Sequence, residues 1–428
     1  MHRGIMFRLS GLLLAAMLVG AACSSDSGTG AGESTADTEG VSDEMGSSVE
    51  DSDAASVPTV DTAAATLVRD LTSLLKGHEY LAGIAVYTAV QAGGDLEDPT
   101  VEAAFGALDE NTKMLGAAIG SIYGPDAEKT FLDSWRAHLG FFVDYTLGAA
   151  TGDKAMQKTA LKDLDGYRAD FGSLIEGATE GELTQDQVAD ALKPHVESTI
   201  TAIDAVVAGT PDAFDKLQEA SGHLPGIATA LAGGISAQQG LEGSVDDGAA
   251  TLQRDLAGLL ASHEYLAGIT VYTAVGAKGD LEDPTVQAAS GALDDNTKDL
   301  AAAIGSVYGP EAENQFLDLW RAHIGFFVDY TLGLATDNSA MQKKALNDLD
   351  GYRADFGALI EGATEGGLTQ DQVAEALKPH VESTVIAIDA AVAGDADAFD
   401  KLQEAAGHLP GIATALSGAI VAQFPDKF

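Results

Sequence analysis

Residues 61–240 and 246–425 are the same sequence written twice without a gap, at an offset of 185 positions. In this alignment 139 of the 180 pairs are identical, about 77 per cent. Sequences this similar adopt the same fold, so we expect two homologous domains, residues 61–240 and 246–428, each large enough for its own core. The join from Gly240 to Val245 is very short, which predicts that the two copies pack together or form a stiff rod.

The N-terminus has the pattern of an export signal. Residues 1–22 contain two arginines followed by an apolar run that is too short to span a bilayer as a helix. Gly20-Ala21-Ala22-Cys23 resembles the bacterial lipoprotein box, in which the cysteine is acylated, and Cys23 is the only cysteine in the chain. We therefore expect lipid attachment at Cys23 and an extracytoplasmic protein anchored to the bacterial cell membrane.

The segment that follows is rich in Ser, Gly, Thr and Ala, and it contains acids but no Lys or Arg. Such a composition cannot bury enough apolar surface to fold, so residues 23–60 are predicted to be a lipidated cysteine and a disordered linker. The whole chain has 66 acidic residues against 23 Lys and Arg, a net charge of −43. This charge argues against nucleic acid as a partner, because nucleic-acid sites need basic patches. Beyond the signal we expect no segment that crosses a membrane.

Each copy is predicted to be an all-α bundle of about six helices. In the first copy these run from Thr62 to Ala92, Pro99 to Tyr123, Pro125 to Gly152, Lys154 to Ile175, Thr184 to Gly209, and from Pro211 onward. Apolar residues recur at helical spacing in these segments, and alternating Val, Ile and Thr runs typical of strands are missing. Thr184 and Gln187 form a capping-box pattern at the start of the fifth helix.

Every histidine outside the signal lies in the duplication, four in each copy. Each shares a helix face with apolar residues, so all are predicted to point into the core, where an unsatisfied ring nitrogen costs about 1–3 kcal/mol. Glu219 and Glu404 stand four residues before a histidine, on the same face. The candidate metal ligands are His78, His138, His195, His223 and Glu219 in the first copy and His263, His323, His380, His408 and Glu404 in the second.

Several ligands remain open at this stage. Imidazole with one carboxylate favours Zn²⁺ or Cu²⁺ over Cu⁺, which prefers sulfur ligands. Haem with two axial histidines is the alternative cofactor. The motifs of ferritin-like and hemerythrin-like iron sites do not occur around these histidines. Further carboxylates that would support a site are Glu79, Asp144 and Asp204 with their counterparts Glu264, Asp329 and Asp389.

The third predicted helix also carries a resemblance. Tyr123-Gly124-Pro125-Asp126-Ala127, Trp135-Arg136-Ala137-His138 and the C-terminal Gln423-Phe424-Pro425-Asp426-Lys427-Phe428 resemble a largely uncharacterised family of secreted bacterial helical-bundle proteins. The resemblance implies an exported all-α protein and implies no activity. The first copy lacks the family's ending and reads Gln238-Gln239-Gly240.

The leading hypothesis is therefore an exported lipoprotein whose two helical bundles each bind a transition metal or a small cofactor at the cell envelope, without catalysis. One alternative is a structural or interaction module of the cell surface whose histidines only build the core. Others are a haem-binding redox protein and a bundle that responds to pH through its histidines.

Overall fold

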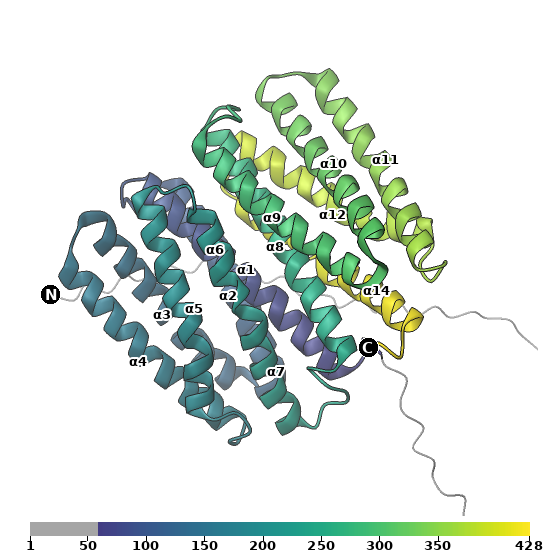
Figure 1. Cartoon of the computed structure of the whole chain (residues 1–428). Coiled ribbons are helices and arrows are strands. Elements are labelled where there is room, and N and C mark those ends of the chain that lie inside the picture. Colours follow the sequence, from purple (N-terminus) through teal and green to yellow (C-terminus); the bar gives the residue numbers. More distant parts are fainter. Residues whose placement is uncertain (1–58) are drawn as a thin grey trace, which may run out of the picture. The chain divides into compact units, whose positions relative to one another are not determined.

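The computed structural model describes residues 59–428, and every regular element in this range is an α-helix (Figure 1). The predicted all-α class is therefore confirmed. The signal sequence, Cys23 and nearly all of the predicted linker lie outside the described residues. The helices of the first copy are α1 (Ala63–Gln91), α2 (Pro99–Tyr123), α3 (Pro125–Thr151), α4 (Lys154–Ala178), α5 (Gln185–Ala208), α6 (Ala213–Gly222) and α7 (Leu224–Gln239). Those of the second are α8 (Gly248–Gly276), α9 (Pro284–Tyr308), α10 (Pro310–Ala335), α11 (Ser339–Ala363), α12 (Gln370–Ala393), α13 (Ala398–Ala406) and α14 (Leu409–Gln423).

Local sequence explains where the helices begin and end. The hydroxyl of Thr62 accepts a hydrogen bond from the backbone N–H of Ala65 and so caps α1. The capping box predicted at Thr184 and Gln187 is present at the start of α5. Pro125 occupies the first turn of α3, and Gly152 closes that helix with a left-handed backbone at φ 70°.

The prediction of about six helices in each copy holds except at the sixth, which the structure divides in two. The predicted sixth helix is divided at His223 into α6 and α7, and at Gly407-His408 into α13 and α14. Pro225 has no N–H to donate to the preceding turn, which favours a break at this position, whereas α5 continues through its own Pro194. The proline instead lies in the first turn of α7, where the missing donor costs nothing.

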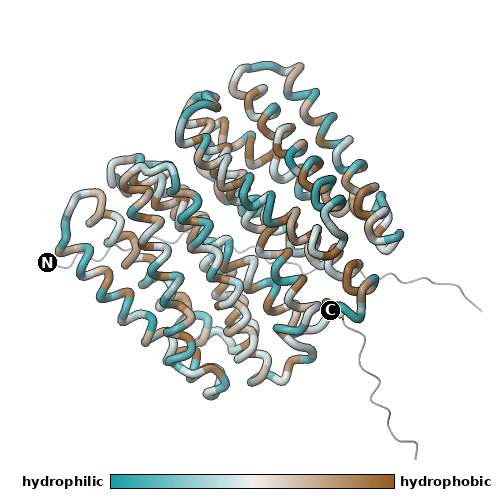
Figure 2. The backbone as a smooth tube through the Cα atoms, in the orientation of Figure 1, coloured by the Kyte–Doolittle hydropathy of each residue, from teal (hydrophilic) through white to brown (hydrophobic). Residues whose placement is uncertain are grey.

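Each copy has its own apolar core. In the first copy α1, α3, α4, α5 and α7 surround Trp135 and Phe171, and the second copy repeats this arrangement around Trp320 and Phe356. The colouring in Figure 2 shows apolar and polar residues interspersed along every helix, as expected for helices that each bury one face.

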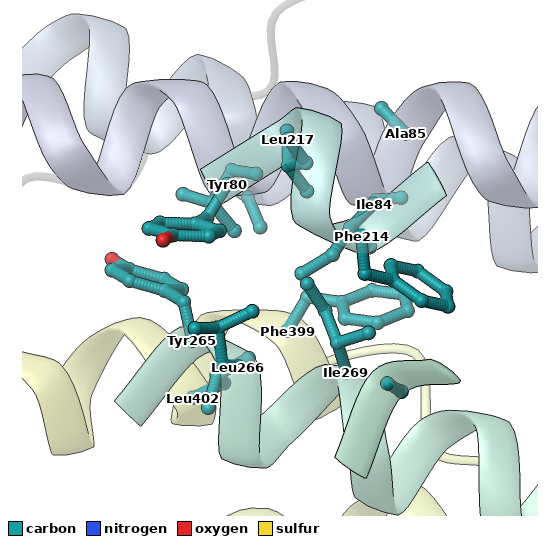
Figure 3. Close-up of a cluster of buried hydrophobic side chains, with 14 of the residues drawn as sticks. Tyr80, Ile84, Ala85, Phe214, Leu217, Tyr265, Leu266, Ile269, Phe399 and Leu402 are labelled. Carbon is teal, nitrogen blue, oxygen red and sulfur yellow. The ribbon is translucent and has the colours of Figure 1, made fainter. Parts of the chain in front are cut away.

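A further apolar cluster joins the two copies. It contains Tyr80, Ile84 and Phe214 from the first copy and their counterparts Tyr265, Ile269 and Phe399 from the second (Figure 3). Helices α1 and α8 pack against each other here, and residues 56–428 form one compact unit. The expectation that the copies pack together is thus confirmed over the alternative of a stiff rod.

The surface between the copies also contains a buried lysine that only the first copy has. Lys76 is 7% exposed, and its ammonium group donates to the hydroxyl of Ser221 over 3.2 Å. Burial lowers the pKa of Lys76 to about 8. In the second copy Ala261 replaces the lysine and Ala406 replaces the serine, so the donor and its acceptor are missing together.

One stretch is apolar and long enough to span a membrane by composition, Ala398–Gln423, contrary to the expectation from the sequence. The structure divides this stretch into α13 and α14 at Gly407. Half of its apolar window is buried inside the protein, and α14 packs on α8. Its hydrophobicity is therefore accounted for by core packing.

Candidate buried histidine and glutamate site

Helix α1 contributes two adjacent polar side chains to the core of the first copy, His78 and Glu79. Successive helical residues project about 100° apart, so the two side chains reach different neighbours. His78 faces α3, where its Nε2 lies 3.4 Å from Nε2 of His138. Glu79 faces α5, where its Oε2 lies 3.7 Å from Nδ1 of His195.

The second copy repeats this arrangement with nearly the same distances. Nε2 of His263 lies 3.3 Å from Nε2 of His323, and Oε2 of Glu264 lies 3.7 Å from Nδ1 of His380. The three histidines and the glutamate of each copy are all buried. The two copies therefore hold two equivalent clusters, which we call the histidine–glutamate clusters.

Trp135 fixes which nitrogen of His78 carries the proton. Its indole Nε1–H donates to Nδ1 of His78 over 3.3 Å, and an indole can only donate. Nδ1 of His78 must therefore be the acceptor, and its proton lies on Nε2. That Nε2–H in turn donates to Nε2 of His138. Trp320, His263 and His323 form the same chain of hydrogen bonds in the second copy.

This chain of bonds leaves His138 with a donor that has no partner. Because its Nε2 accepts from His78, its proton lies on Nδ1, and Nδ1 of His138 is buried without a hydrogen-bond partner. The ring stacks on Tyr167, with centroids 4.7 Å apart. Nδ1 of His195 is also buried without a partner, and the same is true of His323 and His380. Each cluster thus has ring nitrogens without a well-formed hydrogen bond, although the backbone carbonyls of Trp135 and Ala220 act on the pKa of His138 and His195.

Glu79 is 1% exposed and has a single direct donor, the hydroxyl of Thr199 at 3.2 Å. Burial raises the pKa of Glu79 to about 8, and the Thr199 hydrogen bond offsets this only in part. Glu264 has the same donor in Thr384 at 3.1 Å, and burial likewise raises its pKa to about 8. At neutral pH both carboxyl groups are therefore mostly protonated.

The histidines are held in their neutral form. Burial lowers the pKa of His138 to about 3 and that of His195 to about 4. In each case a neighbouring histidine adds to the lowering, and a backbone carbonyl, that of Trp135 or of Ala220, offsets part of it. Burial and the neighbouring histidines likewise lower the pKa of His78 well below its usual value. Neutral imidazole is the form that binds metal ions, so no histidine would need to lose a positive charge before doing so.

An internal cavity adjoins each cluster. It measures about 40 Å³ in the first copy and about 60 Å³ in the second. In the first copy Val206 lines it, and Ala391 takes that position in the second. The polar residues that line the first cavity are His78, Glu79 and Thr199. The rest of its lining is apolar and includes Phe142, Phe214 and Leu217.

The structure brings together three of the four histidines predicted in each copy. His223 and His408 are only half-buried at the α6–α7 and α13–α14 junctions, so the prediction that they point into the core is wrong. The proline after each one ends the helix there, which moves the histidine out of the predicted face. Glu219 is exposed and pairs with Lys216 at 3.1 Å, and Glu404 is exposed as well.

Of the supporting carboxylates, only Glu79 and Glu264 belong to the clusters. Asp204 and Asp389 accept hydrogen bonds from Tyr145 and Tyr330, and Asp144 is exposed. Sequence reasoning missed the roles of Trp135 and Thr199. Their spacing was a usable signal, because Trp135 precedes His138 by three residues and Thr199 follows His195 by four. Within residues 59–428, no three His, Cys, Asp or Glu side chains stand at metal-binding separations.

Comparison of the chain with known protein families, with curated proteins and with solved structures gave no match.

Proposed function

We propose that this chain is an exported lipoprotein, anchored to the cell membrane through Cys23, that binds one transition-metal ion at each histidine–glutamate cluster. Zn²⁺ and Cu²⁺ are the ions that suit imidazole and carboxylate ligands. The two copies would then be two homologous domains with one site each. Storage, delivery or sensing of metal at the envelope would follow, and no catalysis is proposed.

One observation carries this proposal, the separation of the paired histidines. Two nitrogens bound to one tetrahedral zinc ion at about 2.0–2.1 Å lie about 3.3–3.4 Å apart. Nε2 of His78 and Nε2 of His138 are 3.4 Å apart, and the equivalent pair in the second copy is 3.3 Å apart. The backbone therefore supports two imidazoles at the spacing that such an ion needs.

The other donors come from the same cluster. Glu79 lies next to His78 in the chain, and its Oε2 lies 3.7 Å from Nδ1 of His195, so binding of one ion requires Glu79 and His195 to move toward the histidine pair. Metal binding would ionise the Glu79 carboxyl group, since the ion supplies the positive charge that burial otherwise denies it.

Two hydrogen bonds must break for the metal to bind, the one from Trp135 to His78 and the one from His78 to His138. With the indole of Trp135 donating to Nδ1, the Nε2 of His78 carries a proton and has no lone pair for a metal. Binding therefore requires the proton of His78 to move to Nδ1 and the indole N–H to turn away from it. Substitution of Trp135 therefore distinguishes a metal-binding cluster from a purely structural one.

The direct test uses the full chain, purified in detergent without a histidine tag. Elemental analysis by ICP-MS should find about two equivalents of one transition metal per chain, or calorimetry should show uptake of two equivalents of Zn²⁺ or Cu²⁺. The double variant His138→Ala and His323→Ala should lose this binding and keep its helical circular dichroism. A metal-free protein that takes up neither ion would reject the proposal.

A second candidate is the structural module of the cell surface, and it also has an observation in its favour. The chain of hydrogen bonds from Trp135 through His78 to His138 is complete without any ligand, apart from one ring nitrogen. Buried polar networks of this kind can specify a unique core packing. Haem, by contrast, needs a pocket of several hundred Å³, so cavities of about 40 and 60 Å³ would have to open widely to admit it.

A further inference from the structure

A cleft of about 500 Å³ lies between the two copies. It contains no residue of the histidine–glutamate clusters, but it shares Tyr272, Ala391, Ala398 and Phe399 with the cavity beside the second cluster. Its volume falls in the range of small-molecule binding sites, about 300–1,000 Å³. Both copies contribute to it, through the end of α1 and the start of α2 on one side and through α8, α9, α12 and α13 on the other. Its lining includes Tyr87, Pro99, Tyr272, Asp283, Asp395 and Phe399.

Aromatic rings form the floor of this cleft. Tyr87 and Tyr272 occupy equivalent positions in the two copies, and their rings meet at 83° with centroids 6.3 Å apart. Phe399 packs on Tyr272 at 5.4 Å, and its counterpart Phe214 packs on Tyr87 at 5.8 Å. Both tyrosines are only half-buried. Part of each ring is therefore available to a ligand, and two rings at a right angle form the corner of an aromatic cage.

Negative charge surrounds these rings, and none of the residues that line the cleft is Lys or Arg. Asp283 and Asp395 belong to the lining. Burial is the main cause of the raised pKa of both tyrosines; Asp283 adds to it for Tyr87, and Tyr87 and then Asp98 add to it for Tyr272. A net charge of −43 on the chain favours cations over anions at any such opening.

We propose that this cleft binds an organic ammonium cation, with its methylated or alkylated head against the faces of Tyr87 and Tyr272 and its charge balanced by the surrounding aspartates. Aromatic rings attract such cations through their negative faces, and the attraction is stronger where the contact excludes water. A hydrated metal ion would gain little from the rings, whereas an anion would be repelled. The site makes no use of the histidine–glutamate clusters, so it stands independently of the proposed metal binding.

The experiment titrates choline into the full chain in detergent with EDTA present, and follows binding by calorimetry and ligand-observed NMR. The comparison ligand is 3,3-dimethyl-1-butanol, which has the shape of choline without its charge. Choline should bind at least tenfold more tightly than the alcohol. Tyr272→Ala should weaken choline binding at least tenfold and Tyr272→Phe less than threefold, because phenylalanine keeps the ring. Tyr123→Ala, at a half-buried tyrosine outside the cleft, should have no effect.

Two results would overturn the proposal. Equal affinity for choline and the neutral alcohol would mean that the cleft recognises apolar shape and not charge. No binding of choline at 50 mM to a protein that keeps its helical circular dichroism would mean that the cleft is not an ammonium site. Tyr272→Phe guards against misfolding as an explanation, since it removes only a hydroxyl group.

Discussion

Tyr80 and Tyr265, which occupy the same position in the two copies, stack on each other across the surface between them, with ring centroids 5.9 Å apart and ring planes 12° apart (Figure 3). Other contacts here come in reciprocal pairs. Arg69 donates to Thr414, and its counterpart Arg254 donates to Thr229, which is the counterpart of Thr414. Each of these contacts between the copies thus has a counterpart in which the two copies exchange places. Such reciprocal contacts mean that the two halves are related by an approximate twofold axis, as in a symmetric homodimer.

If the copies pair as in a homodimer, the peptide join between them is not needed to hold them together. We predict that a protease site inserted between Gly240 and Val245 can be cut without separating the halves on size-exclusion chromatography or in native mass spectrometry. Combining the cut with Ile84→Asp and Ile269→Asp, which place charges in the shared cluster, should release them. Halves that separate after cleavage alone would show that the join itself maintains the contact.

Trp135→Phe separates the two candidate functions. If the chain of hydrogen bonds is purely structural, the variant leaves Nδ1 of His78 unsatisfied and lowers the free energy of unfolding by about 1–3 kcal/mol, with no metal binding. If the cluster binds metal, the variant frees Nδ1 to carry the proton, so affinity for Zn²⁺ or Cu²⁺ at the first copy stays the same or increases. Calorimetry and urea unfolding measure the two effects. Tyr167→Phe, which keeps the ring on His138, is the matched control.

The buried carboxyl groups predict a maximum of stability between about pH 6.5 and 7 for the metal-free protein. Between about pH 4 and 6.5 the unfolded chain binds more protons at the cluster histidines, whose folded pKa values are lowered, so stability rises with pH. Between 4.5 and about 8 the folded chain binds more protons at Glu79 and Glu264, so stability falls with pH. Each copy has three such histidines and one glutamate, so the histidines still dominate at pH 6.5 and the glutamates dominate only above about pH 7, which places the maximum between these two values.

Each carboxyl group is expected to lower the free energy of unfolding by on the order of 1 to 2 kcal/mol between pH 6.5 and 8, and the histidines and Lys76, whose pKa values are lowered, oppose part of this fall. The double variant Glu79→Gln and Glu264→Gln cannot ionise at these positions. Urea unfolding of the wild type and of this variant at the two pH values therefore isolates the contribution of the carboxyl groups. A difference between the two proteins that does not change with pH would contradict the assignment of a raised pKa to these groups.

Gly83 allows α1 to approach α6 closely. A Cβ atom at this position would lie 2.5 Å from Cδ2 of Leu217, so Gly83→Ala should cost about 1–3 kcal/mol through overpacking. The control is Gly106→Ala on the exposed face of α2, where a Cβ meets nothing within 4 Å. That change should stabilise the protein by about 0.4–1 kcal/mol. Thermal unfolding measures the stability of both variants. Equal changes in stability would contradict the close approach of α1 to α6 at Gly83.

The sequence predicted what depends on local periodicity. The helices, the capping box at Thr184 and the inward faces of His78, His138 and His195 all follow from residues a few positions apart. The division at His223 was missed because a proline near a helix end predicts a kink and a break equally well. The bond from Trp135 to His78 joins residues 57 positions apart, and periodicity fixes a face but not which helix it meets. The cleft between the copies depends in the same way on how α1 meets α8.

The buried lysine beside Ser221 shows what joining two copies in one chain permits. In a symmetric homodimer any substitution near the axis appears twice, so a buried ammonium group on one side would bring a second one on the other. Here Lys76 faces Gly258 on α8, and the position equivalent to this glycine is Ser73. The first copy has kept or gained the lysine with its serine acceptor, while the second has alanine at both positions. Covalent fusion thus frees each half to evolve as one member of a heterodimer, although both still share most of their sequence.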